Sequence, residues 1–135
     1  MSQRTVAPHL AGNVIGAAGN DFVVAEWRDP GGQTGPERPI APLHLHHQDD
    51  EAWYVLEGTL CVRVGEQEIE ATPGSAVFVA RGTPHSYWNP KPEPVRYLLV
   101  MTANIYSLIQ EIHQLKERSL PTLRELFKKY HSELL

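Results

Sequence analysis

Short stretches of β-forming residues, most of them closed by glycine or proline, fill the middle of this 135-residue chain. Many short strands separated by turns are typical of a β-sandwich or barrel. Two sheets packed face to face should also leave no large exposed apolar face. We expect strands at residues 14–15, 22–27, 42–46, 51–57, 59–64, 68–71, 76–80, 85–88 and 95–102.

His44 and His46 stand two residues apart in one of these stretches. Residues two apart on a strand share a face, so both imidazoles should point the same way. A turn at residues 48–50 follows, and an antiparallel return of the next stretch would bring Glu51 near them. His85 begins a later strand and offers a fourth group. Imidazoles and one carboxylate suit a divalent transition metal.

The spacing of these residues resembles the two sequence motifs of the cupin family. The first motif is His44-x-His46, four residues, Glu51, six residues and Gly58, with Arg38 in place of the family's leading glycine. The second is Gly74, five residues, Ala80-x-Gly82, two residues, His85, three residues and Asn89, with Ala80 in place of a proline. The resemblance covers roughly residues 38–102, about half of the chain.

The resemblance implies a double-stranded β-helix, the jelly-roll barrel of the cupins. It also implies that His44, His46, Glu51 and His85 bind one divalent metal ion. Iron, manganese, nickel, copper, cobalt and zinc all fit these ligands, which leave the identity of the metal open. No internal repeat is present, so we expect a single barrel.

Apolar residues change to helical spacing after residue 102, across 105–115 and 123–134. We therefore expect a barrel with N-terminal strands over residues 1–102 and a helical extension over 103–135. The apolar stripe of each helix must be covered. Packing on the chain's own barrel is the interpretation that we favour, and a homodimer interface is the alternative.

Four residues should mark the boundary between the helices. Ser119 and Pro121 are expected to separate them. Thr122 and Glu125 have the spacing of a capping box, which would begin the second helix.

Composition argues against several classes of partner and location. The net charge is -4 and no basic cluster is present, which disfavours nucleic acid. No apolar run approaches the roughly 20 residues of a membrane span, and the first twenty residues lack the pattern of a signal peptide. The single Cys61 cannot form an internal disulfide and fits a reducing compartment. We expect a cytoplasmic homodimer whose partner is a small molecule.

Other side chains are candidates for the surroundings of the metal. Tyr87 shares a face with His85 and is the candidate catalytic residue, through a hydrogen bond to a substrate; ordinary barrel core is the alternative. His47 points to the opposite face from His46 and is expected not to bind metal. Arg63 and Arg96 could bind a substrate carboxylate, although outward-facing arginines are more frequent. An apolar pocket wall is expected from Trp53, Val55, Val77 and Val79.

Three functions fit such a site, and the identity of the four metal ligands does not distinguish them. We expect an enzyme, with an oxygen-dependent oxidoreductase of the dioxygenase type, acting on a small chelating organic substrate, as the leading hypothesis. The second is a metal-dependent lyase or isomerase, in which the metal polarises a carbonyl or carboxylate compound and a side chain such as Tyr87 moves a proton. The third is a module that binds a small ligand without catalysis.

Overall fold

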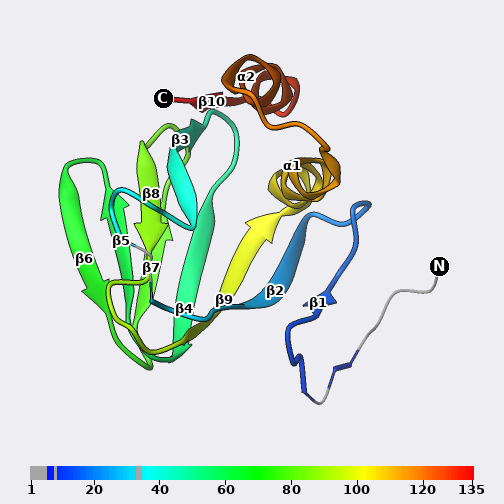
Figure 1. The fold of residues 1–135 in the computed structure, drawn as a ribbon. Helices are drawn as coiled ribbons and strands as arrows, with labels where there is room; N and C mark the ends of the chain where they lie inside the picture. Colours follow the sequence, from blue (N-terminus) through cyan, green and yellow to red (C-terminus); the bar gives the residue numbers. More distant parts are fainter. Residues whose placement is uncertain (1–5, 8, 33–34) are drawn as a thin grey trace.

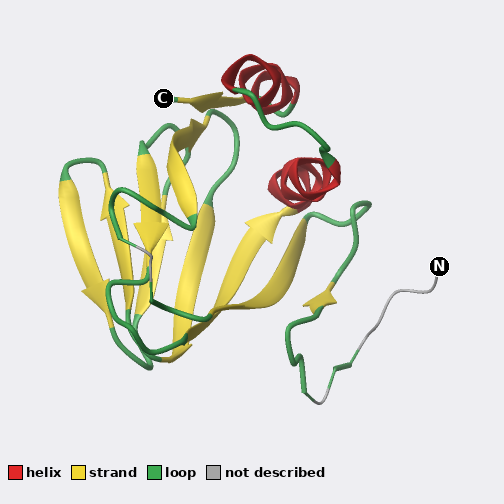
Figure 2. Ribbon diagram, viewed as in Figure 1, coloured by secondary structure: helices red, strands yellow, loops and turns green. Residues whose placement is uncertain are grey.

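Two five-stranded antiparallel sheets make up most of the molecule (Figures 1 and 2). The computed structural model describes residues 6–7, 9–32 and 35–135. The first sheet contains, in spatial order, β1 (Val14–Ile15), β2 (Phe22–Asp29), β9 (Val95–Thr102), β4 (Glu51–Glu57) and β7 (Ala76–Val79). The second contains β10 (Ser132–Leu134), β3 (Ala41–His46), β8 (His85–Trp88), β5 (Leu60–Val64) and β6 (Gln67–Ala71).

The predicted mainly β architecture with two C-terminal helices is confirmed. Strands β1, β4, β8 and β9 begin and end at the predicted residues, and the other predicted strands differ by one or two residues at an end. Strand β2 continues to Asp29 because it pairs with β9 along its whole length, from Phe22 opposite Thr102 to Asp29 opposite Val95.

The inward faces of the two sheets form one apolar core. Alternate residues of β4 point inward, so Glu51 lies on the same face as the buried Trp53 and Val55. This alternation is the ordinary consequence of a pleated strand. It places one carboxylate at the inner end of β4, between the sheets. The other core members include Val23, Ala25, Leu60, Val62, Val77, Val79, Leu99 and Met101.

The outer face of the first sheet is apolar, so the expectation that facing sheets leave no large exposed apolar face is wrong. Phe22, Tyr54, Phe78 and Val100 are exposed by 62%, 41%, 63% and 37%. The strand registers place Ala52 between Phe78 and Val100, so these residues form one continuous surface. Strands β2, β4, β7 and β9 carry apolar side chains on both faces, and packing against the second sheet covers one face only.

Helix α1 (Ala103–Gln114) follows β9 directly and lies beside the ends of the strands (Figure 1). The side chain of Thr102 caps it by accepting a hydrogen bond from the backbone N–H of Ile105 at 3.2 Å. Ile105 and Leu108 are each only 1% exposed, so α1 packs on the chain's own barrel, as favoured from the sequence. No helix in the described part of the chain is long and apolar enough to cross a membrane.

Helix α2 (Leu120–Lys129) begins before the predicted boundary. Ser119 is its N-cap and accepts a hydrogen bond from the backbone N–H of Thr122, so the predicted capping box of Thr122 and Glu125 is wrong. Pro121 stands in the first turn, where its missing N–H removes no intrahelical hydrogen bond. Pro121 therefore helps to begin this helix.

The chain ends in a strand where a continued helix was predicted. Residues 132–134 form β10, which pairs with the edge of β3 in the register Ser132 opposite His46 and Leu134 opposite His44. His131, in the left-handed region at φ 56°, turns the chain between α2 and β10. Backbone hydrogen bonds to β3 are available only in the folded molecule, so they do not appear in the apolar spacing of the sequence.

Two glycines in short connections between strands allow a matched test of close packing. Gly58 and Gly65 both have positive φ, at 79° and 62°. A Cβ at Gly58 would collide with the backbone carbonyl of Pro94, whereas a Cβ at Gly65 would meet no atom within 4 Å. Gly65→Ala should lower the free energy of unfolding by about 1–2 kcal/mol, the cost of a left-handed alanine. Gly58→Ala should lower it clearly more, as measured by urea denaturation; equal losses would contradict the packing described.

Candidate metal centre

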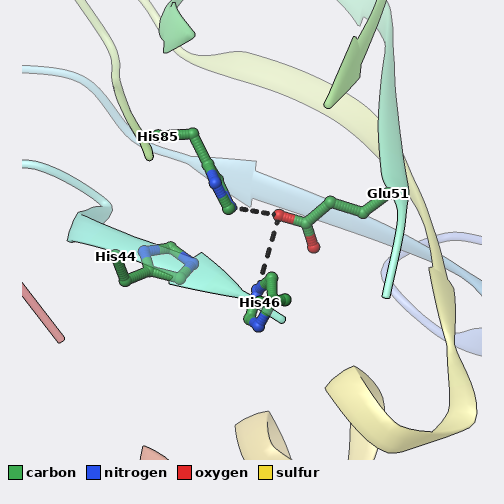
Figure 3. Close-up of side chains that lie close together, drawn as sticks. All are labelled: His44, His46, Glu51 and His85. Carbon is green, nitrogen blue, oxygen red and sulfur yellow. Dashed lines mark hydrogen bonds and ion pairs between the residues drawn. The ribbon is translucent and has the colours of Figure 1, made fainter. Parts of the chain in front are cut away.

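His44, His46, Glu51 and His85 converge between the two sheets (Figure 3). The two histidines of β3 and His85 of β8 belong to the second sheet, and Glu51 enters from β4 of the first. Each is at most 6% exposed, and one ligand atom from each lies within 4.8 Å of the others. The structure therefore brings together all four residues that the sequence predicted as metal ligands.

The Glu51 carboxylate lies close to two of the three imidazoles. Its Oε1 atom is 2.7 Å from Nε2 of His85 and 3.8 Å from Nε2 of His46 (Figure 3). The ring of His44 lies 4.2 Å from that of His85 and 4.8 Å from that of His46, measured between centroids. Strand pairing explains this closeness, because His44 and His85 are direct partners across β3 and β8.

Each imidazole uses its other nitrogen, Nδ1, to bond outside the cluster. Nδ1 of His44 lies 2.6 Å from the carbonyl oxygen of Pro42, and Nδ1 of His85 lies 2.8 Å from that of Thr83. A carbonyl oxygen can only accept, so both Nδ1 atoms carry the proton. Nδ1 of His46 lies 2.7 Å from Oγ of Ser132. The same hydroxyl donates to the carbonyl of Tyr130 at 3.1 Å, so it accepts from His46.

This proton arrangement fits a metal ion. With the ring proton on Nδ1, each neutral imidazole has a lone pair on Nε2, the form in which histidine binds metals. Nε2 of His85 and Oε1 of Glu51 lie 2.7 Å apart, so a single cation placed beside them could bind both atoms. These are nitrogen and oxygen donors, which iron, manganese, cobalt, nickel, copper and zinc all accept.

Two of the imidazoles stay neutral well below neutral pH. Burial, followed by the neighbouring His85 and His46, lowers the pKa of His44 to about 3. Burial, followed by His85, lowers the pKa of His46 to about 3. Desolvation disfavours the charged form of a buried imidazole. Both side chains therefore keep a free nitrogen lone pair at neutral pH.

The cluster opens into a cavity of about 410 Å³ between the barrel and the helices. His44, His46 and Glu51 line its inner part. The rest of the wall is largely apolar and comes from both parts of the chain, including Ile40, Leu99, Ile105, Leu108, Ile109, Ile112, Leu123 and Phe127. The predicted wall of Trp53, Val55, Val77 and Val79 is wrong, since none of them lines the cavity and all four belong to the barrel core.

Tyr87 lines the same cavity and is 5% exposed. Its ring packs against Trp53 and Tyr97 with centroids 5.2 and 5.9 Å apart. Burial, followed by the charge of Glu51, raises the pKa of Tyr87 well above that of an ordinary phenol. The Tyr87 hydroxyl therefore holds its proton at neutral pH and can donate a hydrogen bond, but it cannot act as a base. Its catalytic role stays a prediction.

The charged residues singled out in the sequence lie outside the cavity. Arg63 donates to the carbonyl of Gly65 at 2.9 Å, and Arg96 lies 3.4 Å from Glu26 in an ion pair. His47 is exposed and lies 3.3 Å from Glu133, away from the cluster, as predicted.

Three residues of the site were missed, namely Arg28, Arg118 and Ser132. Arg28 and Arg118 line the cavity, and neither has a side-chain hydrogen bond or ion pair within the described part of the chain. No spacing in the sequence marks them, because Arg28 lies near the end of a strand and Arg118 lies between the helices. The two basic residues Lys128 and Lys129 in the last turn of α2 were a sign that the helix ends there, before Ser132.

Comparison with known proteins supports the fold and identifies a matching family. A family model described as a cupin domain matches residues 29–101. The TT1209 protein of Thermus thermophilus has a similar crystal structure, with a TM-score of 0.52, 32% identity, and coverage of 61% of this chain and 72% of that one. A sugar phosphate isomerase of Silicibacter pomeroyi matches with a TM-score of 0.53, 26% identity, and coverage of 62% and 51%.

A curated relative is much longer than this chain. Mannose-1-phosphate guanylyltransferase RfbM of Salmonella typhimurium is 31% identical over 107 residues, which is 79% of this chain and 21% of that protein. The chain thus spans about a fifth of the length of this relative.

The lowered pKa values of His44 and His46 predict how the stability of the metal-free protein depends on pH. Their folded values of about 3 lie below the unfolded value of 6.5, so the unfolded chain binds more protons between these limits. The free energy of unfolding should therefore fall as the pH drops from 7 toward about 5. Urea denaturation of the metal-free protein measures this. His46→Gln should flatten the dependence, and substitution of the exposed His9 should not; a wild-type stability that is constant over this range would contradict the burial argument.

Proposed function

The chain belongs to the cupin family, and we propose that it is a metal-dependent isomerase of a small phosphorylated sugar or a closely related anionic carbonyl compound. One observation carries the proposal: a single cavity joins three of the four clustered ligands, a protonated phenol and two arginines. A divalent transition metal held by His44, His46, Glu51 and His85 would supply a Lewis acid that polarises the substrate carbonyl.

Arg28 and Arg118 support an anionic substrate. Among the described residues that line the cavity, Glu51 is the only acidic one, and it lies in the cluster. The two guanidinium groups therefore leave the cavity with an excess of positive charge away from the cluster. Charge of one sign along a cleft raises the local concentration of the opposite ion. Guanidinium groups also match the geometry of phosphate and carboxylate oxygens.

Tyr87 is the group that we propose to act on the substrate. Its hydroxyl keeps a proton at Oη and lies in the same cavity as the cluster. From there it can donate a hydrogen bond to a substrate oxygen on which negative charge develops. His113 also lines the cavity and would be the base that takes the proton from the neighbouring carbon and returns one to the product. The apolar side chains of α1 and α2 exclude water from this region, which strengthens such electrostatic contacts.

The relatives support the same class of substrate. The Silicibacter pomeroyi structure is named a sugar phosphate isomerase, and RfbM is named for its action on mannose 1-phosphate. Both names concern phosphorylated sugars. Because this chain spans about a fifth of RfbM, that relative supports the substrate class and not the guanylyltransferase activity.

An oxygen-dependent oxidoreductase of the dioxygenase type is the second candidate. The observation that favours it is the apolar wall of the cavity, with Ile105, Leu108 and Phe127 facing the buried histidines. Such a wall would shield reactive intermediates from water. A chelating phenol, diketone or thiol would be its substrate.

Exchange of carbon-bound hydrogen distinguishes the two candidates. The protein, purified without a histidine tag and loaded with each metal in turn, is given aldose and ketose phosphates in D₂O without oxygen. We expect deuterium to enter the carbon next to the carbonyl, as followed by NMR, and His85→Ala to abolish this. Tyr87→Phe should lower the rate about 10²- to 10⁴-fold, while Tyr54→Phe should leave it unchanged, because Tyr54 lies on the outer face of the first sheet and does not line the cavity.

Oxygen uptake gives the opposing result. Consumption of dioxygen with a chelating phenol, diketone or thiol, together with no deuterium exchange in any sugar phosphate, would replace the isomerase by the dioxygenase. Binding of ligands without either reaction would identify a non-catalytic cupin.

We also propose that the protein is a homodimer, formed through the outer apolar face of the first sheet. The centre of this face, around Ala52, Tyr54, Phe78 and Val100, carries no charged side chain. Two copies related by a two-fold axis can therefore meet there without placing like charges together. An exposed apolar patch of this kind is typical of an interaction surface.

Sedimentation equilibrium tests the dimer. The wild-type protein should have about twice the chain mass of 15.2 kDa. Phe78→Glu should reduce it to the mass of one chain, because a carboxylate cannot be buried unpaired against its own copy. Leu120→Glu is the matched control, since Leu120 is 56% exposed and lies on α2. A wild-type protein with the mass of one chain would contradict the proposal.

A further inference from the structure

We propose that the C-terminal strand β10 belongs to the metal centre, because Ser132 holds the ring of His46 in its binding orientation. Ser132 is then a positioning residue. Metal affinity also depends on the packing of residues 103–135 against the barrel, and this segment is here called the C-terminal cap. This inference rests on the proposed metal binding and adds a partner that comes from outside the two cupin motifs.

The three histidines differ in how they are oriented. His44 and His85 bond through Nδ1 to carbonyl oxygens only two residues earlier, those of Pro42 and Thr83. His46 bonds to Ser132, which is 86 residues later in the chain. Two rings are therefore oriented by carbonyls close to them in the sequence, whereas the ring of His46 is oriented only after β10 has paired with β3.

The hydroxyl of Ser132 is itself fixed. It is 5% exposed, accepts from Nδ1 of His46 at 2.7 Å and donates to the carbonyl of Tyr130 at 3.1 Å. Because the Ser132 hydroxyl gives its proton to Tyr130, only an oxygen lone pair remains to face His46. This contact therefore favours the tautomer of His46 with the proton on Nδ1, which leaves the lone pair of Nε2 toward Glu51. A hydrogen bond of this kind orients a metal-binding imidazole and raises its basicity.

Further contacts fasten the cap to the same strand. The N–H of His47 donates to the carbonyl of His131 at 2.9 Å, and the N–H of Leu135 donates to that of Leu43 at 3.0 Å. The ring of Phe127 on α2 lies edge-on to the ring of His44, with centroids 5.6 Å apart. The cap thus touches two of the four clustered side chains.

Asn104 links the cap to the approach to Glu51. Its side-chain amide donates to Oδ2 of Asp49 at 2.8 Å and to the carbonyl of Tyr130 at 2.9 Å. Asn104 lies in the first turn of α1, Tyr130 is the C-cap of α2, and Asp49 lies two residues before β4. Movement of the cap away from the barrel would break these bonds together with the bond from His46 to Ser132. Since coupling between two events is reciprocal, a bound metal should also hold the cap more firmly.

Matched serine variants test the inference. Ser132→Ala removes the acceptor for His46, whereas Ser86→Ala removes an equally buried hydroxyl, 7% exposed, that donates to the carbonyl of Ala41 at 2.9 Å. Competition with a chromogenic chelator measures the affinity of each protein for Zn²⁺, Mn²⁺ and Co²⁺. We expect Ser132→Ala to bind about 10- to 100-fold more weakly than the wild type, Ser86→Ala to stay close to it, and Ser132→Thr to recover most of the loss.

Hydrogen exchange supplies a readout without activity. Adding metal to the wild type should slow exchange of the amides of His47 and Leu135, which bond across β3 and β10. In Ser132→Ala this effect of the metal should be much smaller, while circular dichroism shows that the variant is folded.

The outcomes separate this inference from the proposed function. If the wild type binds metal and Ser132→Ala binds it as tightly, or if both alanine variants lose the same affinity, the role of Ser132 is refuted and metal binding stands. If the wild type binds none of the three metals, the proposed function and the role of Ser132 are both refuted.

Discussion

Three imidazoles turn their Nδ1–H groups outward to fixed oxygen atoms, and the chemistry of the site depends on that arrangement. The acceptors are two carbonyls and one hydroxyl, those of Pro42, Thr83 and Ser132. As a result the Nε2 atoms face the Glu51 carboxylate at a place where each of the four side chains is at most 6% exposed. Burial then keeps His44 and His46 uncharged, as their lowered pKa values indicate. The barrel serves to hold these four side chains at the inner end of a cavity that a small molecule can enter.

The parts of the site that obey a short-range rule could be predicted from the sequence. His44 and His46 share a face because a strand repeats every two residues. Glu51 does come near them, but the predicted antiparallel pairing of its strand with theirs is wrong, because β4 lies in the facing sheet and pairs with β7 and β9. The motif around Gly82 and His85 supplied the distant member, and the structure pairs His85 directly with His44. Strands β4, β8 and β9 were placed to the residue because glycine or proline lies next to them.

The parts that depend on long-range pairing could not be predicted. Strand β10 is only three residues long and follows a helix, so its one apolar residue, Leu134, fitted the helical spacing of α2. Ser132 therefore had no apparent partner. The cavity wall was assigned to Val55 and Val77 because both point inward, but the helices cover a different part of the barrel. The apolar outer face of the first sheet was also missed. The alternation of residues along a strand shows which side chains share a face, but the prediction did not consider that both faces of these strands carry apolar side chains.

The uneven spacing of the site along the chain has a consequence for the order in which the protein can mature. His44, His46 and Glu51 lie within eight consecutive residues and can meet as soon as the short connection between β3 and β4 has formed. His85 requires β8 to pair with β3, and Ser132 arrives with the last strand. Contacts between distant residues form late because closing a long loop costs entropy. A metal that enters early would therefore meet a loose, incomplete set of donors, and its exchange with the surroundings would slow only when the final strand closes the edge of β3.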